Sequence, residues 1–411
     1  MKSKIVKANI LTLNCGSSSL KYKIIRMPDE ECFVEGEAER VGIKTQGESL
    51  ISHSVSGKTR IIKTELGNHS IALRKILALI KSDAQKNKEI TFDIFAHRYV
   101  HPGNFFTKPV KINKPVLKKL KETLSLAAIH NPITYGLIEF CYKEYETVEQ
   151  FAVFDTAFHR SIPPEFSTYA LPAKISKKYG LKKIGFHGIS HQYVTEEACR
   201  FLKRNIKFQK VISCHLGTGG SSVCAINRGK SVNTSMGFTP LEGLVMNTRC
   251  GDLDLGIIFY IMSKESFSPV ETENILNKKS GILGIFSSSS DLRDVVDNIG
   301  ADPRAKIAFD MYARRVKDYI GFYALILKKT DILVFTDSLG VGVPLLRESI
   351  CDNMAFLGIS LDREKNQTYR NGICELSSAQ AQTKILVVPT NEELMIARET
   401  YKELTENDTR H

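Results

Sequence analysis

No two cysteines in this 411-residue chain have the C-x-x-C spacing, and no apolar run approaches the length of a membrane span. The nine cysteines are scattered and odd in number, so the sequence predicts neither a disulfide framework nor a structural zinc site. A spanning helix needs about 18 to 20 apolar residues. Near the N-terminus, Lys7 and Asn9 interrupt the apolar residues, which argues against a signal peptide or a lipoprotein leader. We therefore expect a soluble, cytoplasmic protein with no membrane partner.

Low-complexity segments and long linkers are also absent, and the length predicts about two domains. The net charge of +12 indicates anionic partners, which leaves nucleic acid, acidic membranes and phosphorylated or carboxylated metabolites open. The densest group of lysines lies at residues 108–124. No recognition module or aromatic stacking pattern accompanies it, so a solvated helix face is favoured over a nucleic-acid site. We expect no nucleic-acid partner.

Two stretches share one pattern, in which strand-like runs flank a loop of small polar residues. They are ILTLNCGSSSLKYKII at residues 10–25 and KVISCHLGTGGSSVCAI at residues 210–226, whose loop is assigned to 215–222. A two-residue turn is enough to reverse a chain, so the additional hydroxyl and amide groups indicate that something is bound there. The repetition predicts two domains on one plan that face each other across a cleft, unless two glycine-rich hairpins resemble each other by coincidence.

Helical and strand-like patterns alternate between and after these stretches. This alternation predicts α/β domains with mixed or parallel sheets. The expected helices are residues 70–86, 115–130, 190–205, 303–329 and 391–404, and the expected strands are residues 92–98, 150–156, 331–336 and 384–390.

Four polar residues are expected at the ends of apolar strands, where an α/β fold collects its functional groups. They are Arg98, Asp155, His187 and Arg249. Each one alone has an ordinary structural interpretation. The two arginines could be surface ion-pair partners, and Asp155 could cap a helix.

Taken in order, the motifs resemble the acetate kinase (acetokinase) family of the acetate and sugar kinase, Hsp70 and actin superfamily. The resemblance covers nearly the whole chain. It implies an α/β fold of two actin-like (ribonuclease H-like) domains with mixed sheets and flanking helices, bounded at residues 1–156 plus 389–411 and 157–388. The matching motifs are NCGSSSLKY, HRYVH, AAIHNP, VFDTAFH, GFHGISH, CHLGTGGSS, NTSMGFTPLEGLVMNTRCGDLD, SSSSDLRD and PTNEELMIARET.

The resemblance implies reversible phosphoryl transfer from ATP to acetate, giving acetyl phosphate and ADP, with Mg²⁺ or Mn²⁺ and in a homodimer. A carboxylate is already deprotonated near pH 7, so this reaction needs no general base. Its difficulty is charge, because the nucleophile and the phosphoryl group are both anionic. Catalysis must therefore come from positioned cations, hydrogen-bond donors and a metal ion.

The family's roles carry over to matching positions of this chain. Arg98 and Arg249 would hold the carboxylate and the phosphoryl group, His187 would donate to the phosphoryl oxygens, and His130 would support the site. Asn14, Asp155 and Glu392 would hold the metal, with Glu393 as an alternative to Glu392. Val100, Ile129, Phe186 and Pro240 would line the acyl pocket. The cofactor-binding residues would be Ser17, Ser19, Lys21, His215, Gly217, Gly219, Asp291, Leu292, Arg293, Ser338, Leu339 and Gly340.

The chain departs from the family pattern at three places. A proline, Pro102, follows His101 where the family has glycine, and Thr218 replaces an asparagine. Residues 337–344 read DSLGVGVP, where the family has a glycine-rich turn of Ala-Gly-Ile-Gly-Glu-Asn beside the adenosine. Pyrophosphate therefore stays open as the donor, and propionate or butyrate as the acceptor. A different class of function, a catalytically weak binding or regulatory module, is disfavoured because the arginines, His187, Asp155 and Glu392 are all retained.

Overall fold

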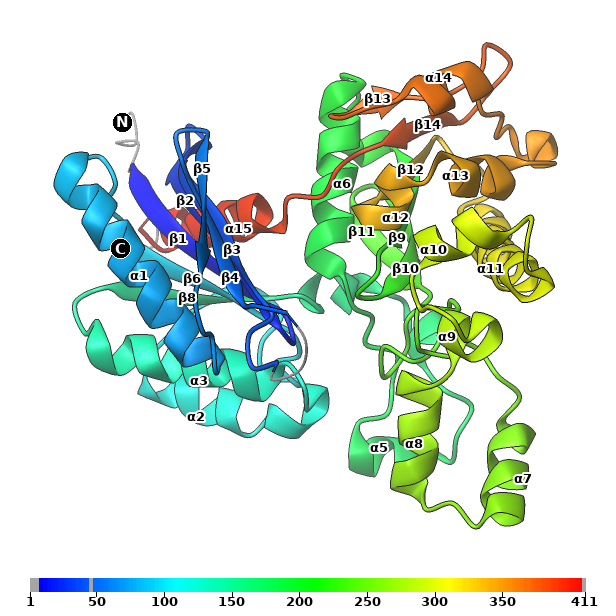
Figure 1. The fold of residues 1–411 in the computed structure, drawn as a ribbon, viewed down its shortest axis with the longest axis horizontal. Helices are drawn as coiled ribbons and strands as arrows, with labels where there is room; N and C mark the ends of the chain where they lie inside the picture. The colour runs from blue at the N-terminus through cyan, green and yellow to red at the C-terminus, as the bar shows by residue number, and fades with distance from the viewer. Residues whose placement is uncertain (1–6, 44–46, 409–411) are drawn as a thin grey trace. The chain divides into compact units, whose positions relative to one another are not determined.

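A computed structural model describes residues 7–43 and 47–408 of the chain. Contacts between Cα atoms divide the chain into two compact units (Figure 1). Unit 1 contains Met1–Ala157 and Asn391–His411, and unit 2 contains Phe158–Thr390. In the described part of the chain, no helix is both long and apolar enough to cross a bilayer.

Unit 1 is built on an eight-stranded sheet with the order β5-β4-β3-β2-β1-β6-β8-β7. Its strands are β1 (Ala8–Cys15), β2 (Ser19–Met27), β3 (Glu31–Glu39), β4 (Leu50–Val55), β5 (Lys58–Lys63), β6 (Ile94–Tyr99), β7 (Val110–Lys111) and β8 (Glu149–Phe154). Its helices are α1 (His69–Lys86), α2 (Lys114–Lys121), the 3₁₀ helix η1 (Leu124–Ala127), α3 (Asn131–Glu144) and the C-terminal α15 (Glu392–Asp408).

Unit 2 is built on a six-stranded sheet with the order β11-β10-β9-β12-β14-β13. Its strands are β9 (Lys210–Leu216), β10 (Ser221–Asn227), β11 (Lys230–Thr234), β12 (Ile332–Thr336), β13 (Cys374–Glu375) and β14 (Lys384–Val387). Its longer helices are α6 (Gly188–Phe201), α7 (Leu255–Glu265), α8 (Pro269–Lys278), α11 (Pro303–Leu327) and α13 (Pro344–Cys351). The shorter ones are α4 (Pro164–Ser167), α5 (Ala173–Tyr179), α9 (Gly281–Phe286), α10 (Leu292–Asn298), α12 (Asp337–Gly342), α14 (Arg363–Thr368), η3 (Ile206–Phe208) and η4 (Ala355–Leu357); η2 (Ala157–Ser161) crosses the boundary between the units.

The two sheets share one plan, as the repeated hairpin pattern predicts. In each sheet an antiparallel meander of three strands is followed by two parallel strands, β3-β2-β1-β6-β8 in unit 1 and β11-β10-β9-β12-β14 in unit 2. The opening hairpin of each plan is the stretch singled out in the sequence. The prediction of two α/β domains with mixed sheets is confirmed.

Side chains alternate along β1 and β9, the first strands of the two units in chain order, so that each strand has a core face and a polar face. In β1, Leu11 and Leu13 pack into the core with α1 and α3, whereas Asn14 contacts α15. In β9, Ile212 and Cys214 pack into the core with α11, whereas Ser213 and His215 contact α6. Both units therefore gather polar side chains beneath one helix.

The expected helix at residues 115–130 is wrong, because the chain forms α2 and η1 there and α3 begins only at Asn131. The fully buried Asn131 explains the break. Its side chain accepts from the amide of His101 and donates to the carbonyls of His101 and Thr123. These three bonds tie the chain at the turn, which a continuous helix could not do.

We predict that Gly36→Ala lowers the free energy of unfolding by about 1–3 kcal/mol through overpacking. A Cβ at Gly36 would clash with the carbonyl of Ser52 and with the hydroxyl of Tyr22, which is fixed by a 2.5 Å bond to the buried His53. Urea denaturation followed by circular dichroism measures the change. The control is Gly136→Ala in α3, where a Cβ meets nothing within 4 Å. This change should stabilise by about 1 kcal/mol, and equal effects of the two substitutions would contradict the packing argument.

Candidate active site

The first group of polar residues lies in unit 1, at the ends of β1, β6 and β8 and the start of α15. The Asn14 amide nitrogen donates to Glu392 and to Glu393, both at 2.8 Å. Arg98 donates to Asp155 at 2.9 Å, and its Nε lies 4.0 Å from the Glu392 carboxylate. We call these five residues the Arg98 group.

Electrostatics keep the Arg98 guanidinium charged. Its side chain is 12% exposed and that of Asp155 only 1% exposed. Burial alone would lower the pKa of Arg98, but the charges of Asp155 and Glu392 outweigh burial and raise it above its ordinary value. The group thus contains three carboxylates around one guanidinium, an excess of oxygen ligands of the kind that Mg²⁺ prefers.

The protein alone offers no complete metal cage in the part that the structure describes, where no three His, Cys, Asp or Glu residues are grouped as metal ligands. This arrangement fits Mg²⁺, which proteins usually bind through one or two carboxylates together with water and substrate phosphates. Asp155 and Glu392, with Asn14 beside them, are the residues that could hold such an ion. Glu393 is 6% exposed and bonds to the same amide, so both glutamates face Asn14.

The first hairpin loop is shorter than its sequence indicates. β1 runs to Cys15 and β2 begins at Ser19, and the amide of Gly16 donates to the carbonyl of Ser19 at 2.9 Å. Ser17 is exposed. Lys21, which pairs with Asn14 in the strand register, is exposed and lines a cavity of about 320 Å³ with Glu37 and Glu393.

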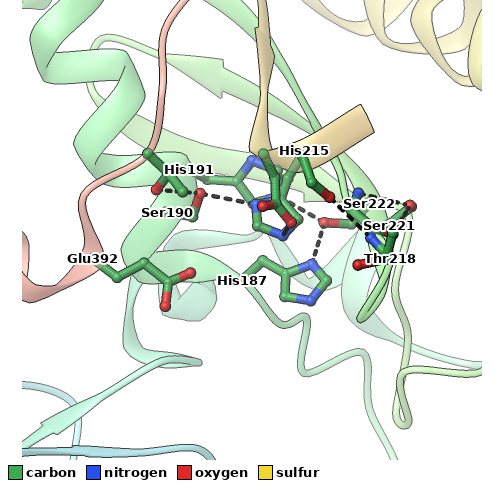
Figure 2. Close-up of polar contacts among 12 residues, drawn as sticks. His187, Ser190, His191, His215, Thr218, Ser221, Ser222 and Glu392 are labelled. Carbon is green, nitrogen blue, oxygen red and sulfur yellow. Dashed lines mark hydrogen bonds and ion pairs between the residues drawn. The ribbon is translucent and has the colours of Figure 1, made fainter. Parts of the chain in front are cut away.

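The second group lies in unit 2, where α6 meets β9 and β10 (Figure 2). His187 immediately precedes α6, and its backbone φ is +56°, in the left-handed region. Its Nδ1 lies 2.9 Å from the Ser222 hydroxyl, and its ring stacks on His215 with centroids 4.2 Å apart. His215 in turn bonds to Ser190 through Nδ1, and its Nε2 lies 3.1 Å from the Asp337 carboxylate.

We call the hydrogen-bonded residues His187, Ser190, His191, Ser213, His215 and Ser222 the histidine group. Arg249 lies beside this group. A Cβ on Gly220 would lie 3.2 Å from an Arg249 guanidinium nitrogen and 3.3 Å from the His187 ring, so this glycine lets the two side chains approach the loop at residues 217–220. Burial lowers the pKa of Arg249 from its usual value. Among the described residues no carboxylate pairs with it, and its guanidinium bonds to the sulfur of Met246. A half-buried guanidinium without an anionic partner is suited to bind an anionic ligand.

The backbone that carries Arg249 is held by α9. The amides of Ile282 and Leu283 donate to the carbonyls of Met246 and Asn247, both at 2.9 Å. Gly281, which begins α9, has a φ of +64°, and a Cβ there would clash with the Met246 carbonyl. Close approach of backbone to backbone therefore sets the position of Arg249.

Two of the four expected strand-end positions are correct. Asp155 follows β8, and Arg98 is the penultimate residue of β6. His187 is instead at a helix start, and Arg249 lies in the irregular segment between β11 and α7. The loop assigned to 215–222 is also too long, because β9 continues to Leu216 and β10 begins at Ser221. Of its expected phosphate-facing residues, His215 is in a strand, whereas Gly217 and Gly219 are in the loop.

The segment at 337–344 is helical rather than an open glycine-rich turn. It forms α12 and the start of α13, and the fully buried Arg347 donates to the carbonyls of Gly340 and Val341 at 2.9 and 2.7 Å. The Ser338 hydroxyl accepts from the amide of Thr218 at 3.2 Å. The Asp337 carboxylate packs against Gly217 so closely that no side chain would fit there.

The remaining expected residues are divided between the units. Val100, Ile129 and His130 belong to unit 1, where Val100 is buried, Ile129 is 55% exposed and His130 precedes α3. Phe186 is buried and Pro240 half-buried in unit 2. Leu292 and Leu339 place their side chains in the unit 2 core, which leaves only their backbones for a ligand. Asp291 caps α10 and pairs with Arg293.

Sequence reasoning missed three residues of the histidine group, namely Ser190, His191 and Ser222. The spacing of His187 and His191 offers a signal, because residues four apart lie on the same side of a helix. Period-two spacing likewise places Ser213 and His215 on one face of β9. The contacts among these side chains could not be read from the sequence, because they join three separate elements.

Two domains with this shared sheet order have the α/β actin-like fold. The chain belongs to the acetokinase family, whose sequence profile matches residues 9–398. It is 45% identical to an acetate kinase of Thermoanaerobacterium thermosaccharolyticum over 96% of this chain and 98% of that protein. Among solved structures it is similar to acetate kinase of Porphyromonas gingivalis, with a TM-score of 0.88, 37% identity and coverage of 97% and 100%. A propionate kinase of Francisella tularensis gives a TM-score of 0.85, 36% identity and coverage of 95% and 98%.

We predict strong energetic coupling between Arg98 and Asp155. Arg98→Met leaves the Asp155 carboxylate buried without its cation, and this should lower the free energy of unfolding by about 3–5 kcal/mol. In Arg98→Met/Asp155→Asn the charge at position 155 is removed together with its cation, so the double variant should be more stable than the sum of the two single effects predicts. Chemical denaturation of wild type, both single variants and the double variant measures the coupling. Additive effects would show that the pair does not interact.

Proposed function

We propose that this chain is an acetate kinase that transfers the γ-phosphoryl group of ATP reversibly to acetate. Similarity to acetate kinases over nearly the whole chain supports the activity. The observation that carries the assignment to this site is Arg249, a half-buried cation beside His187 and the 217–220 loop that lacks a carboxylate partner among the described residues. Such a cation fits a reaction in which two anions must meet.

In the proposed mechanism the chain supplies charge and hydrogen bonds rather than a base. Arg249 and Arg98 neutralise the acetate carboxylate and the phosphoryl group, and His187 donates to a phosphoryl oxygen as negative charge develops there. The hairpin loops at residues 16–18 and 217–220 offer backbone amides and hydroxyls to the donor phosphates. Mg²⁺, held by Asp155 and Glu392 with Asn14 beside them, would neutralise charge on those phosphates when bound.

Acetate is proposed over longer acids because the chain is similar to acetate kinases over nearly its whole length. One methylene in an apolar pocket changes discrimination by only about 10- to 200-fold. Since a propionate kinase is among the similar structures, the acceptor has to be measured.

The direct test is formation of acyl phosphate, trapped with hydroxylamine, from acetate, propionate and butyrate, each offered with ATP, GTP or pyrophosphate. The proposal expects the largest kcat/KM for acetate with ATP and strict dependence on a divalent cation. If no carboxylate yields acyl phosphate with any donor, the protein is a binding or regulatory module and the proposal is wrong.

We predict that Arg249→Ala lowers kcat by at least about 10³-fold, because it removes a cation that faces developing negative charge. Arg249→Lys should recover little, since a lysine cannot reproduce the bidentate guanidinium. Circular dichroism of each variant should match wild type. A matched control is Arg314→Ala, an exposed arginine of α11 that is paired with Asp318 and has no proposed role, which should leave kcat unchanged. Activity of Arg249→Ala within threefold of wild type would exclude this role.

Pyrophosphate remains the second candidate donor, because of specific contacts around α12. The Ser338 hydroxyl already accepts a hydrogen bond from the amide of Thr218, and Asp337 adds a carboxylate beside Gly217. Both residues replace small ones of the family pattern. They reduce the number of free backbone donors and add negative charge where the donor phosphates are proposed to bind.

We predict that Asp337→Ala/Ser338→Gly raises kcat/KM for ATP about tenfold, which corresponds to about 1.4 kcal/mol. The freed Thr218 amide and the lost carboxylate both favour bound phosphate. Calorimetry of ADP binding and kinetics with ATP and pyrophosphate measure the change. Tight ADP binding by wild type with no gain in the variant would remove the pyrophosphate alternative.

We also propose a homodimer in a reducing cytoplasm. All nine cysteines are free, which suits a reducing compartment. None of the residues of α7 is buried, although the helix is mostly apolar, and Leu255, Phe259 and Tyr260 are 69%, 71% and 64% exposed. A surface of this kind favours burial against a second copy. Sedimentation velocity of wild type and Phe259→Lys tests this, and a monomeric wild type would contradict it.

A further inference from the structure

A chain of hydrogen bonds connects His187 to the interior of unit 2 (Figure 2). Nδ1 of His187 lies 2.9 Å from the Ser222 hydroxyl, and Nε2 of His191 lies 2.8 Å from the same hydroxyl. Nδ1 of His191 then lies 3.0 Å from the Ser213 hydroxyl. One serine oxygen therefore bridges two imidazoles.

The bridge restricts where the protons lie. A hydroxyl has a single proton, so Ser222 can donate to only one of the two rings, and the other ring must donate to Ser222. His191 is fully buried, and burial, followed by the nearby His159 and His215, lowers its pKa well below the usual value. His191 is therefore neutral and has one N–H. The nitrogen of His191 that carries this proton determines the direction of every hydrogen bond in the chain.

The other nitrogen of His187 is the one next to the proposed site. Nε2 of His187 would lie 3.3 Å from a Cβ on Gly220, beside Arg249 and the 217–220 loop. Because Nδ1 is engaged by Ser222, a neutral His187 can donate to a phosphoryl oxygen only from Nε2. This requires Nδ1 to accept from Ser222, and Ser222 then to accept from His191.

We propose that His191 is a positioning residue that holds His187 as its Nε2–H tautomer through Ser222. In this arrangement Ser213 donates to Nδ1 of His191, Nε2–H of His191 donates to Ser222, and Ser222 donates to Nδ1 of His187. No bond to carbon or phosphorus is involved, and His191 does not touch the substrate. The inference rests on the proposed function for the donor role of His187, but the tautomer itself is a property of the free protein.

The reversed direction is the competing arrangement. There, His187 carries a proton on Nδ1, in the neutral or the doubly protonated form, and donates it to Ser222, and Ser222 donates to His191. The stacked His215 ring, whose centroid lies 4.2 Å away, is next to His187 in both arrangements. Direct observation of the protons is therefore needed.

The first measurement is two-dimensional ¹H–¹⁵N NMR of the histidine rings in the full-length, ligand-free protein at pH 7.5, assigned with His187→Gln. The proposal expects a protonated Nε2 and an unprotonated Nδ1 for His187. A neutral His187 protonated at Nδ1, or a doubly protonated His187, would overturn it. This result does not depend on whether the protein phosphorylates acetate.

The second measurement compares His191→Leu with His191→Gln. Leucine fills the space but cannot donate, so kcat should fall at least about tenfold, as expected when a proton donor is misplaced, with both KM values within about twofold of wild type. The glutamine amide can donate to Ser222 and should restore most of kcat. The NMR spectrum of His191→Leu should show His187 protonated at Nδ1 in part of the population.

Other outcomes decide against the proposal. Equal kcat for the leucine variant and wild type, with an unchanged His187 tautomer, would show that His191 only packs. Equal losses in both variants would also overturn it. Ser222→Ala, which removes the bridge without altering His191, keeps the question testable if His191→Leu fails to fold, and it should lower kcat as His191→Leu does. If wild type forms no acyl phosphate at all, the proposed function fails while the tautomer remains measurable.

Discussion

The side chain of Asn14 joins the first strand of unit 1 to the last helix of the chain, and the rest of that unit's site depends on this contact. Its amide donates to Glu392 and Glu393, which lie 378 and 379 residues later. The bond holds the start of α15 at the end of β1, next to Arg98 and Asp155. The bond helps to place the carboxylate of Glu392, which lies 4.0 Å from Nε of Arg98.

The two polar groups differ in how their charges are balanced. In unit 1, Arg98 is surrounded by carboxylates and the excess is negative, which suits a divalent cation. In unit 2, Arg249 has no carboxylate partner among the described residues, and imidazoles and backbone amides lie nearby. In the proposed reaction between two anions, the first kind of surroundings would hold the metal ion and the second would receive the transferred charge.

The histidine group is a polar network whose buried members contact a half-buried histidine, His187. His191, Ser222 and Ser213 satisfy one another, so the cost of burying them is offset by hydrogen bonds. The same bonds restrict His187 at the edge of the network.

The α12 region carries the chain's largest departure from the family pattern. Buried Arg347 holds that region through hydrogen bonds to the carbonyls of Gly340 and Val341.

The sequence by itself determined the two-domain α/β plan, the opening hairpins and the family. It also singled out Arg98, Asp155, His187 and Arg249 as candidate site residues. These features follow from local periodicity and from motifs of consecutive residues, which a linear reading can recognise. Only the tertiary structure decided that the helix at 115–130 breaks at Asn131, that 337–342 is helical, and that both Glu392 and Glu393 reach Asn14. The break at Asn131 and the contact of both glutamates with Asn14 depend on hydrogen bonds between separate segments, namely the three bonds of Asn131 and the two N–H groups of the Asn14 amide. The helix at 337–342 also has a distant bond, in which Ser338 accepts from the amide of Thr218. Such bonds form only when folding brings the partners within about 3 Å of each other, and no spacing along the chain encodes that distance.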